Sequence, residues 1–448
     1  MTMVALCFAN GLQGGMSQTF AQATDAIKHS FHVNDAVIGI VPFGVGLAGN
    51  FGGVAVAAFC ARRRRVAVLA AMFLAWGVLV AVAGLTPPVR VAGLAVGFAI
   101  FAIARIGSAG FEATDPAALS LIADWWPVER RAGRVSVFNT LSALGAIVGL
   151  AVAGVLVDNG LWRASFVLWL PLAGLGAFLM LRQTEPRRGA MDAAFEQRLE
   201  ELADIEPEVI AAAIAEDVAH PPPPDERLID AAREVGRIRS WRTAALGIAL
   251  TGLAGTAVMN WGIAYFKRTF HLSGVQAAGL APVLGIGAFA GVLGGGFLAD
   301  RLLARGMLRA RLYVTAFGFA AAGIVYLAAF STTRLWIAAP LQGLAAACAS
   351  ITVGPQFAML MDVTPARLRP QASAALNVLQ ASGALGSLLV GILSTLFGEN
   401  LRLALLCVSP FYLVGGALVL KAGSAFVDDV AAVVADAASG GGLSPGST

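Results

Sequence analysis

The sequence predicts an all-α membrane protein with twelve transmembrane helices, and three observations lead to this prediction. Hydrophobic residues make up 58% of the 448 residues and charged residues only 13%, whereas about a quarter of the residues in a soluble domain are charged. The mean hydropathy is +0.77. Apolar runs of the ~20 residues that a helix needs to cross a bilayer recur along the chain. They lack the alternation of barrel strands, so helices in a bilayer are expected.

Each apolar run lies between charged or Pro/Gly-marked breaks and is expected to form one spanning helix. The twelve runs cover residues 3–28, 34–60, 66–85, 91–122, 134–157, 164–181, 243–268, 273–299, 312–331, 334–361, 371–397 and 401–421. In the fourth run, Asp115 with Pro116 predicts a break near one end. No basic segment precedes the first run, which we therefore expect to act as an uncleaved insertion signal.

Arginine residues gather in every second loop, and the positive-inside rule assigns those loops to the cytoplasm. The groups lie at residues 62–65, 130–134, 301–311 and 367–369. Both termini and the long loop after the sixth run are then cytoplasmic. The richness in Ala, Gly and Arg suggests a GC-rich bacterial source, so we expect the protein in the inner membrane.

The chain repeats itself at a shift of 238 or 239 residues. "ADWWPVERR" from Ala123 matches "MDVTPARLR" from Met361, and "FNTLSALGA" matches "LNVLQASGA" in the same order. "RASFVLWLP" from Arg163 matches "RLALLCVSP" from Arg402. An even number of spans separates the copies, so two parallel six-helix halves are predicted, as in transporters whose halves rock about a central site.

Four regions follow from these patterns. Residues 1–182 form the N-terminal six-helix bundle, 183–242 a cytoplasmic linker, 243–421 the C-terminal bundle and 422–448 a cytoplasmic tail. The linker is expected to hold two surface helices separated by the stiff segment "PPPP". The tail is acidic and then rich in Gly and Ser, which is typical of disorder.

Two charged residues stand inside the apolar fourth run. Arg105 and Glu112 are seven positions apart and so share one helix face. Each charge costs about 2.5 to 3.5 kcal/mol in the bilayer, and the repeat places Gly343 and Ser350 at the equivalent positions. Since the second half forms its helix without them, function is favoured over mutual pairing for packing alone. Arg105 offers a donor fork for a carboxylate, sulfate or phosphate, and a desolvated Glu112 can exchange a proton.

The stretch "GGGFLADRLLARG" from Gly294 resembles the loop motif of the major facilitator superfamily. The resemblance implies a conformational latch, in which the glycine lets two helices approach closely and the acid pairs with arginines. Its residues are Gly296, Asp300, Arg301 and Arg305. The first half keeps glycines and arginines but has Ala58 or Cys60 in the place of the acid, so a one-sided latch is expected.

Within that superfamily the chain is similar to spinster-like transporters. The stretches "DAIKHSFHVNDAVIGI", "ARIGSAGFEA", "FKRTFHLSGVQAAGL" and "ASAALNVLQASGALGSLLVGILS" carry this resemblance. It implies that Arg105 and Glu112, followed by Ala113, lie in a central cavity and couple transport to protons, with lysolipid or sphingoid-type substrates. An acid expected in the first helix aligns with Met16, so coupling would fall on Glu112 alone. "GLWRASF" also resembles a signature of organic anion symporters.

Further polar and aromatic residues are candidates for lining a cavity. They are Gln18, Gln22, Asn260, Trp261, Tyr265 and Gln356. A hydrogen bond between helices or a packing role is the alternative for each of them. The four His and four Cys residues show no metal-ligand spacing, and no nucleophile lies near a base, so we expect neither a metal, a cofactor nor an enzyme.

The sequence thus predicts a secondary active transporter of a small organic anion or amphipathic lipid-like molecule, working by alternating access and coupled to protons. Its expected partners are this substrate, protons and the lipid bilayer, without nucleic acid, and it is expected to be a monomer. A multidrug exporter of the same fold is the first alternative, although a site at Arg105 argues against cationic drugs. The second is a non-transporting membrane receptor that uses the linker to bind a cytosolic partner.

Overall fold

The computed structural model describes residues 2–61, 63–126, 128–186, 228–365 and 369–440, and its regular elements there are α-helices with one isolated bridge between Val91 and Leu94. Eleven helical segments in these ranges are long and apolar enough to cross a membrane. Helix α1 (Thr2–Phe31) has 30 residues, which is also long enough to cross a membrane, but it is not among these eleven. The predicted all-α class is confirmed, and the predicted count of twelve spanning helices is roughly consistent with these segments.

The chain divides into two compact units. Unit 1 contains residues 1–221 and 262–279, and unit 2 contains residues 222–261 and 280–448. Besides α1, unit 1 holds α2 (Asp35–Ala61), α3 (Arg65–Leu85), α4 (Val96–Glu112), α5 (Asp115–Trp125), α6 (Val128–Asp158), α7 (Trp162–Val167), α8 (Trp169–Leu181) and α13 (Gly274–Ala278). The second part of α12 (Arg239–Phe270) also belongs to unit 1.

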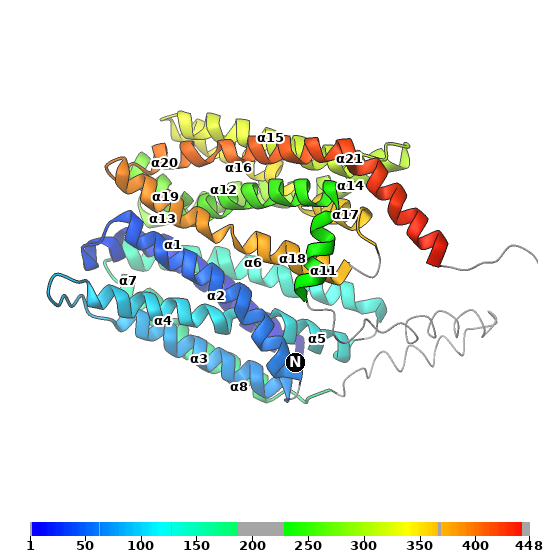
Figure 1. The fold of residues 1–448 in the computed structure, drawn as a ribbon. Helices are drawn as coiled ribbons and strands as arrows, with labels where there is room; N and C mark the ends of the chain where they lie inside the picture. Colours follow the sequence, from blue (N-terminus) through cyan, green and yellow to red (C-terminus); the bar gives the residue numbers. More distant parts are fainter. Residues whose placement is uncertain (1, 62, 127, 187–227, 366–368, 441–448) are drawn as a thin grey trace, which may run out of the picture. The chain divides into compact units, whose positions relative to one another are not determined.

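Close packing in unit 1 depends on glycine. Helix α1 lies along α6, and α3 lies along α8 (Figure 1). A Cβ atom on Gly145 of α6 would lie only 1.9 Å from the carbonyl oxygen of Gly11 on α1. The two backbones touch here, as small residues allow between membrane helices.

Unit 2 begins within the predicted linker. Its helices are α11 (Leu228–Arg237), the first part of α12, α14 (Ala281–Ala304), α15 (Ala310–Ser331), α16 (Leu335–Ser350), α17 (Val353–Asp362), α18 (Arg369–Ala381), α19 (Ala384–Leu396), α20 (Leu401–Val408) and α21 (Pro410–Gly440). Helix α15 packs along α21, which continues into the region predicted as a tail (Figure 1). The first predicted linker helix and the "PPPP" segment lie outside the described residues.

The fourth span is broken where the sequence predicts it. Helix α4 ends at Glu112, and α5 begins at Asp115 with a proline in its first turn, where the missing N–H is harmless. The tenth span has the same break, since α16 ends at Ser350 and α17 begins at Val353. Thr114 and Thr352 occupy the two equivalent N-cap positions.

The sequence repeat is also a repeat of contacts. Arg163 donates hydrogen bonds to two carbonyl oxygens at the end of α3, and its counterpart Arg402 donates to two carbonyl oxygens at the end of α15. Each arginine therefore satisfies carbonyl groups that a helix end leaves without partners. The arginines that begin the matched stretches "RASFVLWLP" and "RLALLCVSP" thus have the same structural role in the two halves.

Candidate functional site

The two charges of the fourth span meet on one face of α4. The NH1 atom of Arg105 lies 2.8 Å from Oε1 of Glu112, so the side chains span two helical turns to form an ion pair. Arg105 is 3% exposed, whereas the side chain of Glu112 is 20% exposed. The carboxylate is therefore less enclosed by the protein than the guanidinium group.

Neighbouring groups hold this pair in place. Ser108 accepts a hydrogen bond from NH1 of Arg105 at 2.8 Å, and the indole N–H of Trp76 on α3 donates to Oε1 of Glu112 at 2.9 Å. The Nε atom of Arg105 is buried and has no hydrogen-bond partner among the described residues. A buried donor without a partner is costly, so Arg105 keeps capacity for a further acceptor.

A second polar contact lies at the break after α4. Thr114 donates a hydrogen bond from Oγ1 to Oε1 of Gln13 on α1 at 3.0 Å. The Nε2 group of Gln13 is buried without a partner among the described residues. Sequence reasoning missed Gln13 and Trp76, because a lone polar residue in an apolar run gives no signal of which residue on another helix it contacts.

The candidate cavity residues of unit 1 have different surroundings. Gln18 is half-buried and its amide contacts Ser17 at 3.4 Å. Gln22 is fully buried and donates from Nε2 to the carbonyl oxygen of Gly274 at 2.7 Å. Tyr265 is fully buried beside the ring of Phe266. Gln22 thus links helices, which is the alternative role considered for it.

In unit 2, two of the candidates bind the same residue. Asn260 donates to Oγ of Ser387 at 2.7 Å, and the indole N–H of Trp261 donates to the carbonyl oxygen of Ser387 at 2.9 Å. Both contacts join α12 to α19. Gln356 instead lines a groove of about 320 Å³ in this unit.

The groove of unit 2 contains neutral polar groups, aromatic rings and apolar side chains. Its walls include Thr251, Thr256, Gln356, Gln380, Phe319 and Tyr412. Among the described residues, no charged side chain lines it. Such a lining suits an uncharged ligand or the uncharged part of a larger one.

The predicted latch differs from the observed contacts in two respects. The space around Gly296 is open, whereas a Cβ atom on Gly295 would lie 1.9 Å from the carbonyl oxygen of Ile351. The close helix approach is therefore made by Gly295, because the next residue points about 100° away around the helix. Asp300 is 75% exposed and lies 3.8 Å from Arg311, so Arg311 rather than Arg301 or Arg305 is its partner in the described contacts.

Arg311 also pairs with the last residue of α17. Its NH1 atom lies 2.6 Å from Oδ1 of Asp362. In unit 1 the equivalent pair joins Arg65, the first residue of α3, to Asp124 at 2.5 Å. The repeat matches Asp124 with Asp362, so each half holds the start of one helix to the end of another by the same ion pair.

The first half has no acid at the motif position, but Glu185 supplies an acid from outside the motif. Its Oε1 atom accepts hydrogen bonds from Nε and the backbone N–H of Arg65, both at 3.1 Å, and Oε2 accepts one from the N–H of Val66 at 2.9 Å. Glu185 thereby caps α3 as well. The motif places its acid before the loop, whereas Glu185 follows α8, so motif spacing could not find it.

Comparison with known proteins identifies the family. Residues 6–388 match the profile of the Major Facilitator Superfamily. The chain belongs to this superfamily. As a Major Facilitator Superfamily member it is a multi-pass membrane transporter for a small molecule and not an enzyme. A comparison with curated protein sequences gave no match.

Solved structures of other Major Facilitator Superfamily transporters resemble the chain. A bacterial homolog of the human lysosomal transporter Spinster, in an inward-facing and occupied conformation, is 20% identical with a TM-score of 0.73, covering 95% of this chain and 97% of that one. A D-xylose-proton symporter is 17% identical with a TM-score of 0.61, covering 94% and 96%. The nucleoside transporter NupG is 14% identical with a TM-score of 0.61, covering 96% and 98%. These likenesses show the fold.

Proposed function

We propose that the protein is a proton-coupled secondary transporter that moves a small organic anion or an anionic, lipid-like amphiphile by alternating access. Arg105 binds the anionic group and Glu112 carries the proton. We place it in a bacterial inner membrane with both termini in the cytoplasm. The observation that supports this proposal is the buried guanidinium group of Arg105. Its Nε donor has no partner among the described residues, and it lies beside the partly exposed carboxylate of Glu112.

Charge balance gives the coupling step. Arginine stays protonated in proteins, so buried Arg105 requires a negative charge nearby. Glu112 supplies this charge while it is ionised. When Glu112 takes up a proton, the charge of Arg105 is no longer compensated and an anion in contact with it restores neutrality. Proton and anion therefore bind together, which is symport.

The uneven distribution of charge between the halves supports a functional role. Positions 343 and 350, equivalent to 105 and 112, carry glycine and serine. The described lining of the groove in unit 2 likewise includes no charged side chain. The preference for an anion therefore depends on α4.

A ligand screen tests the anion site. Purified protein is melted in the presence of lysophospholipids and small mono- and dicarboxylates, because a bound ligand raises the melting temperature. We expect an anionic compound to stabilise the protein and Arg105→Ala to lose that shift. Arg105→Lys, which keeps the charge without the fork, should retain part of it. A full shift with Arg105→Ala would reject the site.

The compound identified by this screen is then used to test the coupling. Its uptake is measured in proteoliposomes across which a pH gradient is applied. Glu112→Gln should keep the thermal shift and lose uptake driven by the gradient. Asp115→Asn is the matched control, since Asp115 is an exposed acid three residues further along. Proton-driven uptake at the wild-type rate with Glu112→Gln would contradict the proposal.

A further inference from the structure

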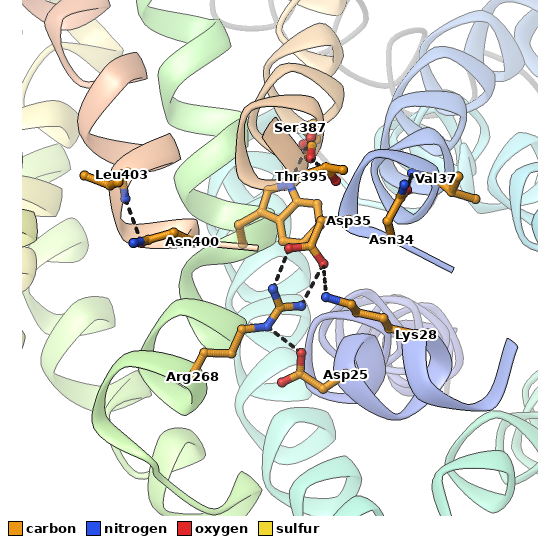
Figure 2. A network of polar contacts seen from close by, with 12 residues as sticks. Asp25, Lys28, Asn34, Asp35, Val37, Arg268, Ser387, Thr395, Asn400 and Leu403 are labelled. Carbon is orange, nitrogen blue, oxygen red and sulfur yellow. Dashed lines mark hydrogen bonds and ion pairs between the residues drawn. The ribbon is translucent and has the colours of Figure 1, made fainter. Parts of the chain in front are cut away.

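Four charged residues form a network at the ends of α1, α2 and α12, all within unit 1. Arg268 points its guanidinium fork at Asp35, with contacts of 2.5 and 2.9 Å, and its Nε atom lies 2.7 Å from Oδ1 of Asp25 (Figure 2). Lys28 lies 3.2 Å from the Asp35 carboxylate, which is fully buried. A bidentate pair of this kind is strong and directional.

The end of α12 and the start of α13 are bound at three further points. Lys267 donates from Nζ to the carbonyl oxygen of Gln22 at 2.9 Å. Asp158, the last residue of α6, accepts hydrogen bonds from the backbone N–H groups of Gly274 and Val275 at 2.6 and 2.9 Å. These polar contacts join residues 262–279 to α1, α2 and α6, in addition to the packing of buried residues such as Ala277.

The repeat shows that the fold does not require these charges. Residues 27–34 and 266–273 match at a shift of 239, and both segments end their helix with a histidine in the left-handed region, His32 at φ 52° and His271 at φ 53°. The backbone turn is thus the same in both copies. At this shift, however, Arg268 corresponds to His29, and Asp25 and Asp35 correspond to an alanine and a glycine. Only one copy has the acids and only the other has the arginine.

Helix α12 is shared between the two units. Its residues up to Trp261 belong to unit 2, and its residues from Gly262 onward belong to unit 1. In transporters of this superfamily the two halves rock against each other during transport. Because α12 has residues in both units, that motion alters its contacts with at least one of them.

We propose that Arg268 is a positioning residue of the transport cycle: its ion pairs with Asp25 and Asp35 hold the end of α12 and α13 on unit 1, and they separate when that end is released. Ion pairs suit a contact that must form and break. The desolvation of buried charges offsets most of their attraction. The free energy of the separated, hydrated ions is therefore only slightly higher than that of the ion pair. The fork of Arg268 nonetheless fixes a single geometry while the contact lasts.

The reactivity of a cysteine placed on α13 shows whether the end of α12 and α13 is in contact with the rest of unit 1. Ala277 is fully buried and lies on α13, which packs against α6. Ala277→Cys is introduced into the full chain after Cys7, Cys60, Cys348 and Cys407 have been replaced by serine. The rate of reaction with a water-soluble maleimide is then measured in lipid nanodiscs. No substrate is needed, so the result is independent of the proposed anion site.

We expect Arg268→Gln to raise the labelling rate roughly tenfold or more, because it leaves Asp35 buried without its fork. Arg268→Lys keeps the charge and should restore part of the protection. Arg163→Gln is the matched control, since Arg163 also lies on unit 1 but bonds carbonyl groups rather than acids. Wild-type labelling in Arg268→Gln, or an equal rise in Arg163→Gln, would overturn the proposal.

Asp25→Asn provides a second variant in case Arg268→Gln does not fold. It removes the more exposed carboxylate and leaves the fork on Asp35 intact. A smaller rise in labelling, roughly threefold, is expected for a partly exposed pair. No rise in this variant would also count against the proposal.

Discussion

Replacing Arg65 and Arg311 by glutamine removes the equivalent ion pairs with Asp124 and Asp362, and the structure predicts unequal costs. Arg65→Gln also removes the buried contact with Glu185, whereas Arg311→Gln removes only a long, exposed contact with Asp300. The side chains of Arg65 and Asp124 are 3% and 8% exposed, whereas those of Arg311 and Asp362 are 24% and 32% exposed. Removing one partner of a buried pair costs about 3–5 kcal/mol, because a charge is left buried alone. A pair in contact with solvent contributes about 0–1 kcal/mol.

Thermal unfolding of the two purified variants in one detergent measures this difference. A loss of 1 kcal/mol lowers the melting temperature by about 2–4 °C for a domain of this size. Arg65→Gln should therefore melt roughly 10 °C below the wild type, and Arg311→Gln within about 3 °C of it. Equal losses, or a drop of only a few degrees for Arg65→Gln, would refute the assignment of cost to burial.

Two more paired comparisons use neighbouring or repeated positions. Gly295→Ala should lower the melting temperature by several degrees, since its Cβ would lie 1.9 Å from a backbone oxygen. Gly296 faces open space, so Gly296→Ala should raise the melting temperature slightly through better helix propensity. Thr114→Val should cost about 1–3 kcal/mol, because it leaves the amide of Gln13 buried without its donor. Thr352→Val should cost less, since that hydroxyl donates to the carbonyl oxygen of Ala349, only three residues earlier. Equal melting temperatures within either pair would contradict the reasoning.

The class of fold and the repeat could be predicted because they depend on local patterns. Runs of apolar residues specify spanning helices whatever packs against them. The break before Asp115 also follows from a local rule, since proline is favoured in the first turn of a helix. Arg163 and Arg402 were matched from the sequence because both copies kept the same spacing to a proline.

Partners on different helices could not be predicted in the same way. Arg65 and Arg311 are 246 residues apart, so the shift of 238 that matches Asp124 with Asp362 does not match the arginines. The choice of Gly296 rather than Gly295 failed because a motif fixes spacing but not the rotation of a helix. Arg268 and Asp35 looked like ordinary loop charges; extending the repeat to residues 27–34 and 266–273 would have singled them out.

Glu185 has a consequence for the chain that follows it. This residue and Pro186, whose carbonyl oxygen accepts from Arg65, are the last described residues before the connection between the halves. Strain on that connection would first reach the N-terminal end of α3, where Glu185 accepts hydrogen bonds from the N–H groups of Arg65 and Val66. A partner or a truncation that strains the connection would thus act on the bundle where Arg65 and Asp124 meet.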